Sequence, residues 1–522
     1  MSDAPAPPPS PWTPPDGDEP AQEVPDRPAW LPPAGPRPPP AGPQPPPAGP
    51  QPPPAGPGPR GWAPGQWPPV PPPSRRHALL PAVLVVALLA VLATGGGLAL
   101  VARGRDRTAA PATTLAPPVP TAPPATTPPT SAPPANGQAR SAIAGVERRV
   151  EEVRDLRFTR AVPTRILSPA KLAAELLRVV DADTDEAALT RQGRALVLLG
   201  ALRPGTDLPK LIRSVQAESV LGFYVPGRPP GKGRLYVRSS QGLDPYAEFV
   251  LSHELTHAVT DQHFDLTRSD RLQAQGRDDE VAAYSALAEG DATLTMQRYL
   301  TEKLTTAQQL AVAGTASRER TPKLDAAPAA LRESLLFPYQ TGLSFVRALY
   351  DRGGWAAVNR AYADPPTSTE QVMHPEKFLA RDRPQPVAVP DLARALGAGW
   401  RPAAEVQWGE FDTQLVLAGE LPVTVADAAA EGWDGGRLRT FERGGRTALV
   451  LRTVWDSPGE ASEFCRASAR WATARLGPTV GPGRWSGHGQ ELALACRDTR
   501  ATLLSAPDRP TLAKLSSGLG RP

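Results

Sequence analysis

Apolar residues recur at helical spacing in the part of the chain that follows residue 140. From Ile143 to Val153 they fall three or four positions apart, which predicts an amphipathic helix. The same spacing predicts further helices over 169–180 and 185–200, the second ending at a glycine. A short β-rich run at Thr164–Leu167 predicts a strand between the first two helices.

Two more β-rich runs predict a hairpin in front of another helix. They cover Gly222–Val225 and 234–239, and a turn rich in Gly and Pro separates them. Asp244 followed by Pro245 is typical of a helix start, because aspartate caps the free backbone N–H groups and proline fits the first turn. We therefore expect a helix that extends to about Asp261.

The rest of the chain predicts long helices and then a small mixed unit. Helices are expected over 278–313, 327–336 and 341–363, with Gly353 and Gly354 interrupting the last. The pattern changes near Leu421, where strands are expected over 437–443, 447–454, 491–498 and 501–505, and helices over 459–476 and near 511.

These elements predict an α+β protein with two folded parts. A mainly helical domain with a small β-sheet is expected over 141–420, and a small C-terminal α+β unit over 421–522. Cys465 would lie in a helix of that unit and Cys496 in the following strand, so a disulfide can join them if the helix packs on the strand.

The first 140 residues have a different composition. Most of the 68 prolines lie there, and a seven-residue Pro/Ala/Gly unit occurs three times between Pro38 and Gly58. Such a tract cannot bury a core, so 1–77 is expected to be a disordered tail. Residues 78–102 contain no charge and are long enough to cross a bilayer, which predicts one transmembrane helix rather than a cleaved signal peptide. A Thr/Pro/Ala linker over 103–140 follows.

Arginines flank the apolar segment on both sides, so charge alone does not orient it. The linker and the cysteine pair favour an oxidising compartment, which predicts a single-pass membrane protein whose folded part is extracytoplasmic. The net charge of +4 comes from 57 basic and 53 acidic residues dispersed along the chain. This balance does not favour nucleic-acid binding.

The motif His253-Glu254-Leu-Thr-His257 lies on the helix expected after the hairpin. Residues four apart share one helical face, so the two histidines can bind one metal ion with Glu254 beside them. A catalytic Zn²⁺ site needs three protein ligands and an open fourth position. The sequence therefore predicts a zinc site with two assigned protein ligands, His253 and His257, and a third that remains to be assigned.

Several residues are candidates for the third ligand. Glu289 is favoured, because it lies among small residues on a later helix that could approach the first closely. His263 has suitable spacing, but the chain has Thr260 where a glycine would be needed for the sharp turn. Asp261 and Asp291 remain further candidates, either as ligands or as hydrogen-bond partners of the histidines.

The stretch from His253 to Asp261 resembles the active-site helix of thermolysin-type metallopeptidases, and a glutamate ligand on the next helix is the gluzincin arrangement. The segment around Glu289 departs from thermolysin, so that resemblance covers little more than one helix. Together with Phe337-Pro-Tyr339 and the segment 368–377, the chain looks more like uncharacterised, envelope-anchored bacterial gluzincin-like proteins over about 141–507. This resemblance implies a zincin fold for the helical domain.

The residue types predict a zinc metallopeptidase acting on a peptide or protein substrate. Glu254 would be the general base, strand 234–239 would bind the extended peptide, and Tyr339 or His374 would stabilise the oxyanion. The alternative is a non-catalytic cell-envelope interaction protein that keeps the zincin fold, with or without zinc. The presence of Glu254 favours catalysis.

Overall fold

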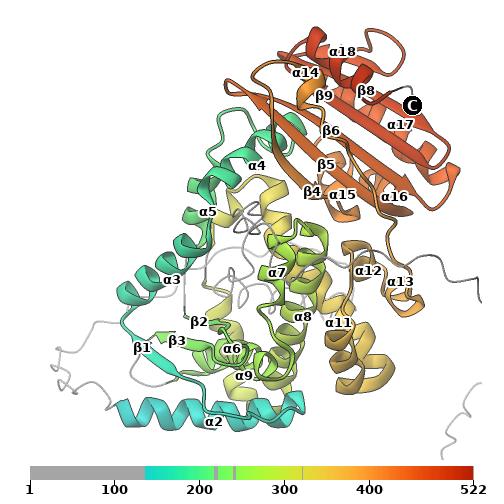
Figure 1. The fold of residues 1–522 in the computed structure, drawn as a ribbon. Helices are drawn as coiled ribbons and strands as arrows, with labels where there is room; N and C mark the ends of the chain where they lie inside the picture. Colours follow the sequence, from blue (N-terminus) through green and yellow to red (C-terminus); the bar gives the residue numbers. More distant parts are fainter. Residues whose placement is uncertain (1–135, 217–220, 239–242, 320, 521–522) are drawn as a thin grey trace, which may run out of the picture. The chain divides into compact units, whose positions relative to one another are not determined.

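The computed structural model describes residues 136–216, 221–238, 243–319 and 321–520 (Figure 1). All of them belong to one compact unit, Pro71–Pro522. The predicted disordered tail, the apolar segment 78–102 and most of the predicted linker lie outside the described residues.

The expectation of a single-pass membrane protein needs correction. In the part of the chain that the structure describes, no helix is both long enough and apolar enough to span a bilayer. The segment 78–102, on which the expectation rested, is outside that part. The membrane anchor and the extracytoplasmic location derived from it are therefore unsupported.

A three-stranded sheet lies near the start of the described chain. Its strands are β1 (Thr164–Leu167), β2 (Gly222–Val225) and β3 (Arg234–Arg238), in the order β1-β3-β2. β2 and β3 pair antiparallel, so the predicted hairpin is present, and β1 pairs parallel to β3. Helix α3 (Pro169–Asp183) packs on one face of the sheet through Phe223 and Tyr236, and helix α6 (Pro245–Phe264) packs on the other.

Three long helices form the centre of the helical part: α6, α8 (Asp278–Lys303) and α11 (Ala329–Ala363). Apolar side chains of α8 and α11 share one core cluster. The remaining helices of this part are α2 (Asn136–Arg154), α4 (Glu186–Leu198), α5 (Leu208–Gln216), α7 (Arg268–Ala274), α9 (Thr306–Ala316), α10 (Pro322–Asp325), α12 (Thr369–Met373) and α13 (Pro375–Ala380).

Two helix boundaries differ from the prediction. The stretch 278–313 is two helices, because Thr305 and Gln308 form a capping box that starts α9. The stretches 327–336 and 341–363 are one helix, α11, with Pro338 inside it. The expected interruption at Gly353 and Gly354 is confirmed, since both have non-helical backbone angles.

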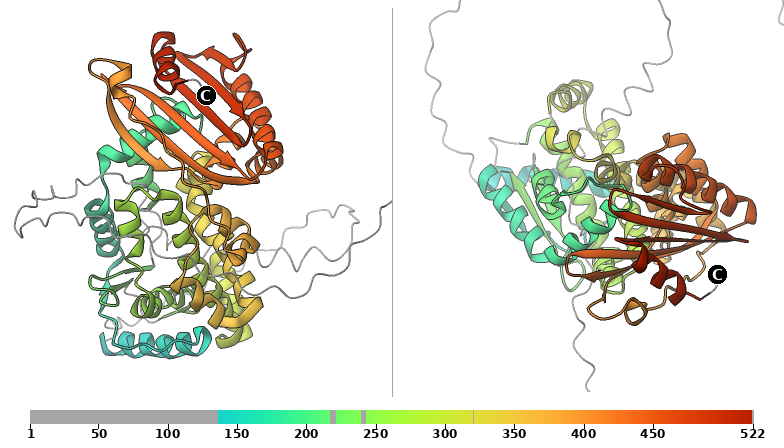
Figure 2. Two further views of the ribbon diagram at one scale, coloured as in Figure 1. Left: turned by 45° about the vertical axis from the view of Figure 1, so that its right-hand side comes forward. Right: turned by 90° about the horizontal axis from the view of Figure 1, so that it is seen from above.

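The C-terminal part is a six-stranded antiparallel sheet in the order β4-β5-β6-β9-β8-β7 (Figures 1 and 2). Its strands are β4 (Arg401–Gln407), β5 (Trp433–Arg443), β6 (Arg446–Trp455), β7 (Arg484–Gly487), β8 (Gln490–Arg497) and β9 (Arg500–Ala506). The two edge strands, β4 and β7, were not predicted. Pro402 weakens the strand signal of β4, and a proline is tolerated on an edge strand because it need not donate to a neighbour.

Helices cover both faces of this sheet. Leu449 and Leu451 of β6 face a cluster that includes helix α17 (Pro458–Leu476), whereas Ala448 and Val450 face a second cluster. The helices of the two clusters are α15 (Glu410–Ala418), α16 (Val423–Ala430) and α17 on one face, and α14 (Ala393–Leu396) and α18 (Arg509–Gly518) on the other.

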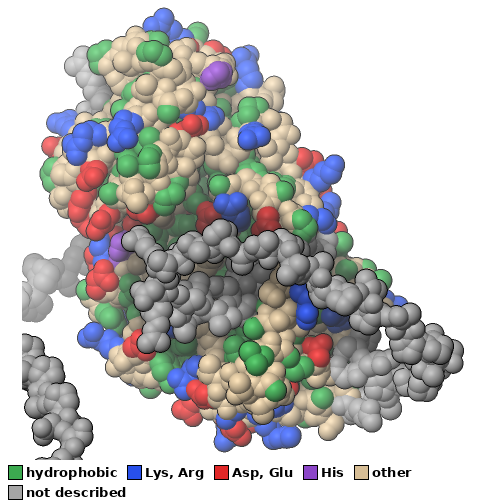
Figure 3. All heavy atoms as spheres, turned by 180° about the vertical axis from the view of Figure 1, so that it is seen from behind, with side chains coloured by type: hydrophobic (Ala, Val, Ile, Leu, Met, Phe, Trp, Pro, Cys, Tyr) green, Lys and Arg blue, Asp and Glu red, His purple; other side chains and the backbone are tan. Residues whose placement is uncertain are grey.

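A disulfide joins Cys465 of α17 to Cys496 of β8, with a Cα–Cα distance of 6.5 Å. The expected pairing is therefore present in the structure. Charged side chains of both signs are interspersed over the face of the molecule opposite to Figure 1 (Figure 3).

Candidate metal centre

Helix α6 carries three of the predicted site residues. Asp244 starts the helix by accepting a hydrogen bond from the Ala247 backbone N–H at 2.7 Å. His253 and Glu254 are almost fully buried and His257 is 7% exposed, so the polar face of this helix points into the protein. Three ionisable side chains buried within five residues require compensating partners.

Glu289 of α8 is the partner of both histidines. Its Oε2 lies 3.1 Å from His253 Nε2 and 3.2 Å from His257 Nε2, and the two Nε2 atoms are 3.0 Å apart. Glu289 was the favoured third ligand, and the structure brings it to the histidine pair. The three side chains form a group that can hold a metal ion.

The triangle of donor atoms fits a zinc ion. Bond lengths of about 2.0–2.1 Å at tetrahedral angles give ligand-to-ligand distances of about 3.3 Å, close to the observed 3.0–3.2 Å. Two imidazole nitrogens facing each other at 3.0 Å need a cation or a bridging proton between them. The donor set of two imidazoles and one carboxylate is also one that zinc favours.

Backbone contact between α8 and α11 fixes the position of Glu289. A Cβ atom on Gly290 would lie 2.1 Å from the Gly342 carbonyl oxygen, and one on Gly342 would lie 2.3 Å from the Ala286 carbonyl oxygen. Both positions therefore require glycine for the helices to approach this closely. The residue next to Glu289 is thus held by direct contact between two backbones.

Glu254 has one satisfied and one unsatisfied carboxylate oxygen. Its Oε2 accepts a hydrogen bond from the Tyr224 backbone N–H at 2.8 Å, while its buried Oε1 has no hydrogen-bond partner. Burial raises the pKa of Glu254 to about 8, and the charge of Glu289 adds to the increase. A cavity of about 20 Å³ bordered by Glu254, Gly222 and Val250 has room for about one water molecule.

The electrostatics of the three ligands are coupled. Burial alone would lower the pKa of His257, but the charge of Glu289 and its hydrogen bond raise it to about 9. Burial would likewise raise the pKa of Glu289, and the two histidines lower it to about 2. In His253, burial dominates and lowers the pKa. Without a metal the triad therefore holds a proton on His257, which metal binding must release.

Asp261 and Asp291 do not bond to the histidines among the residues that the structure describes. Asp261 accepts hydrogen bonds from the Tyr224 hydroxyl at 2.8 Å and from the Leu266 backbone N–H at 3.0 Å, so it ties the hairpin to the end of α6. Asp291 accepts two hydrogen bonds from Arg154, at 2.6 and 3.0 Å. Without direct contact, its negative charge contributes to the raised pKa of His257 and partly opposes the lowering of the pKa of His253 by burial.

Arg154 is a residue that the sequence reasoning missed. It ends α2, is fully buried, and its guanidinium group lies 4.4 Å from the centre of the Trp355 ring. Tyr362 also donates to Asp291, at 2.9 Å. The one available signal was the position of Arg154 directly after the apolar stripe of α2. These contacts meet at Asp291, two residues after Glu289 on α8, and they join α2, α8 and α11 at that point.

The other candidate residues have different surroundings. Tyr339 is buried with its ring centre 6.3 Å from that of His253, and burial together with the charges of Glu289 and Glu254 raises its pKa well above the usual value. His374 bonds to Glu410 of α15 at 2.9 Å, and no contact in the described chain joins it to His253, His257 or Glu289. His263 is exposed and bonds to the Arg157 carbonyl oxygen at 2.8 Å, away from the triad.

The strand expected to bind substrate is not available for that role. β3 lies between β1 and β2, so both of its edges are already paired. β2 is the edge strand, and the Arg238 N–H donates to the Leu221 carbonyl at 2.9 Å. Given this pairing, the backbone groups of Gly222 and Tyr224 point away from β3, as the bond from Tyr224 N–H to Glu254 confirms.

Part of the chain is similar to known proteins. Residues 399–516 match a family described as a "Domain of unknown function (DUF8575)", which covers the six-stranded sheet and not the metal centre. No curated protein matches the chain. One similar solved structure is the "Crystal structure of a putative hydrolase with a novel fold from Chloroflexus aurantiacus". The match covers 47% of this chain and 89% of the other, with 16% identity and a TM-score of 0.33, a likeness too low to assign fold or activity.

Proposed function

We propose that this chain is a zinc-dependent hydrolase that cleaves peptide bonds, with His253, His257 and Glu289 as the protein ligands. The observation that carries the proposal is the convergence of three ligand atoms at 3.0–3.2 Å beside a buried carboxylate with a free oxygen. Three protein ligands leave a fourth position for chemistry. Zinc bound there would lower the pKa of a water molecule and polarise a carbonyl group.

Glu254 is suited to act as the general base. Its Oε1 is unpartnered, and the positive charge of a bound Zn²⁺ would favour the ionised carboxylate that a general base requires, against the effect of burial. The Tyr224 backbone N–H holds the other oxygen, which fixes the carboxylate in one orientation. Glu254 can therefore accept a proton from water and deliver it to the leaving amine.

The outer edge of β2, with which no described strand pairs, supports a peptide as the substrate. The backbone groups of Gly222 and the carbonyl of Tyr224 face the same side as Glu254, so an extended chain added along this edge would pass the general base. Tyr339, buried beside His253, is the candidate hydrogen-bond donor to the developing oxyanion. His374 is not retained in this role because it bonds to Glu410 instead.

The proposal is tested by incubating the zinc-loaded protein with an unbiased peptide library. Glu254→Gln should keep its zinc and reduce cleavage about 100-fold to 10,000-fold, because only the proton acceptor is lost. Glu248→Gln, a buried glutamate of the same helix that bonds Tyr299, is the matched control and should cleave at the wild-type rate. Equal cleavage by Glu254→Gln and wild type would refute the mechanism, and no cleavage by wild type would favour a non-catalytic interaction protein.

A further inference from the structure

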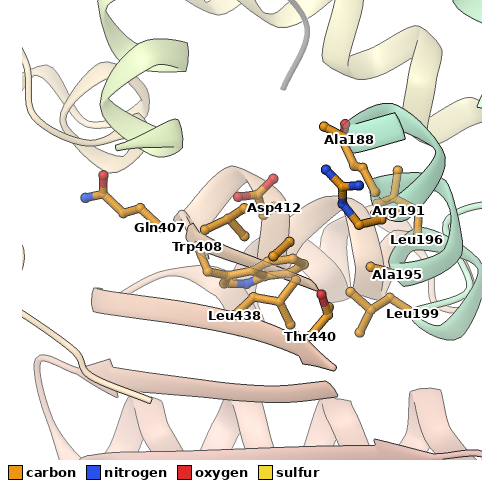
Figure 4. Close-up of a pocket in the computed structure, with 13 residues that line it drawn as sticks. Ala188, Arg191, Ala195, Leu196, Leu199, Gln407, Trp408, Asp412, Leu438 and Thr440 are labelled. Atoms are coloured by element: carbon orange, nitrogen blue, oxygen red, sulfur yellow. The ribbon is translucent and has the colours of Figure 1, made fainter. Parts of the chain in front are cut away.

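A second cavity lies between helix α4 and the first two strands of the six-stranded sheet. It has a volume of about 70 Å³ (Figure 4). Its apolar lining comes from Trp408 and Leu438 on one side and from Ala188, Ala195 and Leu199 on the other. The Trp408 indole N–H is already bonded to Thr413 Oγ1 at 2.9 Å, so the cavity meets the face of the ring.

Polar groups without partners line the same cavity. Four buried atoms of lining residues have no hydrogen-bond partner among the described residues: Arg191 Nε, Gln192 Oε1, Gln407 Oε1 and Thr440 Oγ1. Leaving such groups unpaired is costly, about 1–3 kcal/mol each. Four of them on residues that line one cavity can gain partners from a polar ligand there once their side chains rotate toward it.

Asp412 and Arg191 line the cavity with opposite charges and do not form an ion pair with each other. Asp412 uses one oxygen to accept the Gly409 backbone N–H at 3.0 Å, and the ion pair of Arg191 is with Asp185 at 3.9 Å. Figure 4 shows the Asp412 carboxylate and the Arg191 guanidinium on the same side of the Trp408 ring. A ligand that reaches both would offer a negative group to Arg191 and a hydrogen-bond donor to Asp412.

The walls of the cavity are fixed to each other by contacts outside it. Arg194 of α4 forms an ion pair with Glu442 of β5 at 2.8 Å. The Gln490 amide donates to the Leu198 carbonyl at the end of α4, also at 2.8 Å. The cavity is therefore formed where α4 packs on the sheet. The strands of that sheet lie within residues 399–516, the segment that matches the family of unknown function.

We infer that this cavity is a binding site for an aliphatic amino-acid residue with a free carboxylate. The carboxylate would bind Arg191, the N–H would donate to Asp412, and the side chain would pack on Trp408 and Leu438. Each water-sized site needs about 10–15 Å³, so a volume of about 70 Å³ suits a side chain the size of valine or leucine. The same chemistry is offered by a free amino acid and by the C-terminal residue of a peptide.

Calorimetric titration of the full chain tests this inference. Leucine should bind, and leucine amide should bind at least about 10-fold more weakly, because it lacks the carboxylate. N-acetyl-leucine and a tripeptide ending in leucine show which of the two ligands the cavity takes. If they bind more tightly than leucine does, the ligand is the C-terminal residue of a peptide; if they bind more weakly, it is the free amino acid. His253→Ala should bind leucine as wild type does, so the result is independent of the metal centre.

Variants distinguish a built site from a cavity that holds only water. Arg191→Gln should weaken leucine binding about 10-fold or more and remove the preference for leucine over its amide. Thr440→Val keeps the shape of the side chain and should weaken binding without unfolding the protein. Arg466→Gln, an exposed arginine of α17 outside the cavity, should bind as wild type does. No heat of binding for leucine or the tripeptide at millimolar concentration, or equal binding by Arg191→Gln and wild type, would overturn the inference.

Discussion

His253 and Glu289 lie 36 residues apart in the chain, yet their side chains meet at 3.1 Å in a buried position. Burying two imidazoles and a carboxylate costs several kcal/mol unless each group is paired, so this arrangement is unfavourable as a plain packing solution. A metal ion would compensate all three groups at once. The same reasoning favours Glu289 over His263 as the third ligand. His263 is exposed, and its ring already bonds to the Arg157 backbone carbonyl.

The first prediction concerns this choice of third ligand. Glu289→Ala should lower zinc retention severely, because it removes one of three donor atoms. His263→Ala should leave the zinc content unchanged, since its ring bonds to Arg157 outside the triad. Zinc analysis after dialysis measures both. The reverse pattern would exclude the triad as the zinc site.

The second prediction concerns Asp278, the first residue of α8. Burial raises its pKa to about 7, and the charge of Asp412 adds to the increase. An acid with a raised pKa binds its proton more tightly in the folded state, so it lowers stability progressively as pH rises from about 4 to about 7. Asp278→Asn does not ionise and should therefore gain on the order of 1–3 kcal/mol over wild type at pH 8.

Thermal unfolding at pH 5 and pH 8 measures this effect. The melting temperature of Asp278→Asn should exceed that of wild type at pH 8 by more than at pH 5. Asp351→Asn, an exposed aspartate of α11, is the control and should give the same difference from wild type at both values. A constant difference for Asp278→Asn would show that Asp278 does not titrate in this range.

Residue-scale features differ in how far they were predictable. The spacing of His253 and His257 on one helix face follows from the sequence alone, and the small neighbours of Glu289 marked it as a residue on a closely packed helix. The pairing of Arg154 with Asp291 spans 137 residues, and no local pattern encodes a contact at that separation. His374 was assigned by elimination among the few histidines, which could not anticipate its bond to Glu410.

At the scale of elements, the crossing of α8 and α11 positions Glu289 beside the two histidines. The third prediction is that Gly342→Ala forces these helices apart, because its Cβ would lie 2.3 Å from the Ala286 carbonyl oxygen. The variant should be destabilised by about 1–3 kcal/mol and should bind zinc more weakly. Chemical denaturation and competition with a zinc chelator measure the two effects.

Gly314→Ala in α9 is the matched control for that substitution. Its added Cβ would meet nothing closer than an arginine side chain at 4.0 Å, so the higher helix propensity of alanine should stabilise the protein by about 0.5–1 kcal/mol. Zinc affinity should not change. If Gly342→Ala behaved like this control, the backbone contact would not be what positions Glu289.

Most elements could be predicted because their hydrophobic periods are strong, and the exceptions have physical causes. The edge strands β4 and β7 lack a continuous apolar pattern, since an edge strand is less buried than a central one. The role expected for strand 234–239 was wrong because a hairpin does not reveal which of its strands will pair with a third. That third strand, β1, lies about 70 residues earlier in the chain and pairs parallel to β3.

At the scale of the whole molecule, the disulfide belongs to the six-stranded sheet and not to the metal centre. Cys465 and Cys496 are 31 residues apart, and closing such a loop contributes about 3 kcal/mol in the chain-entropy model. The fourth prediction is that replacing both cysteines with serine lowers the melting temperature but leaves zinc content unchanged. Thiol labelling of the native protein should find no free cysteine, and two labelled thiols would contradict the pairing.

The two proposed sites can be separated experimentally because they share no residue. The metal centre is built by α6 and α8, and the second cavity is built by α4 and the six-stranded sheet. Loss of zinc should leave leucine binding intact, and loss of Arg191 should leave the zinc content intact. A variant in one site that abolished both properties would indicate unfolding rather than a specific defect.

X-ray absorption at the zinc edge of the purified protein tests the proposed zinc centre most directly. We expect one zinc per chain with two imidazole nitrogens, one carboxylate oxygen and one position that exchanges with solvent. His257→Ala should lose this spectrum. Absence of zinc from protein purified in its presence, or a closed shell of four protein ligands, would contradict a catalytic zinc centre formed by His253, His257 and Glu289.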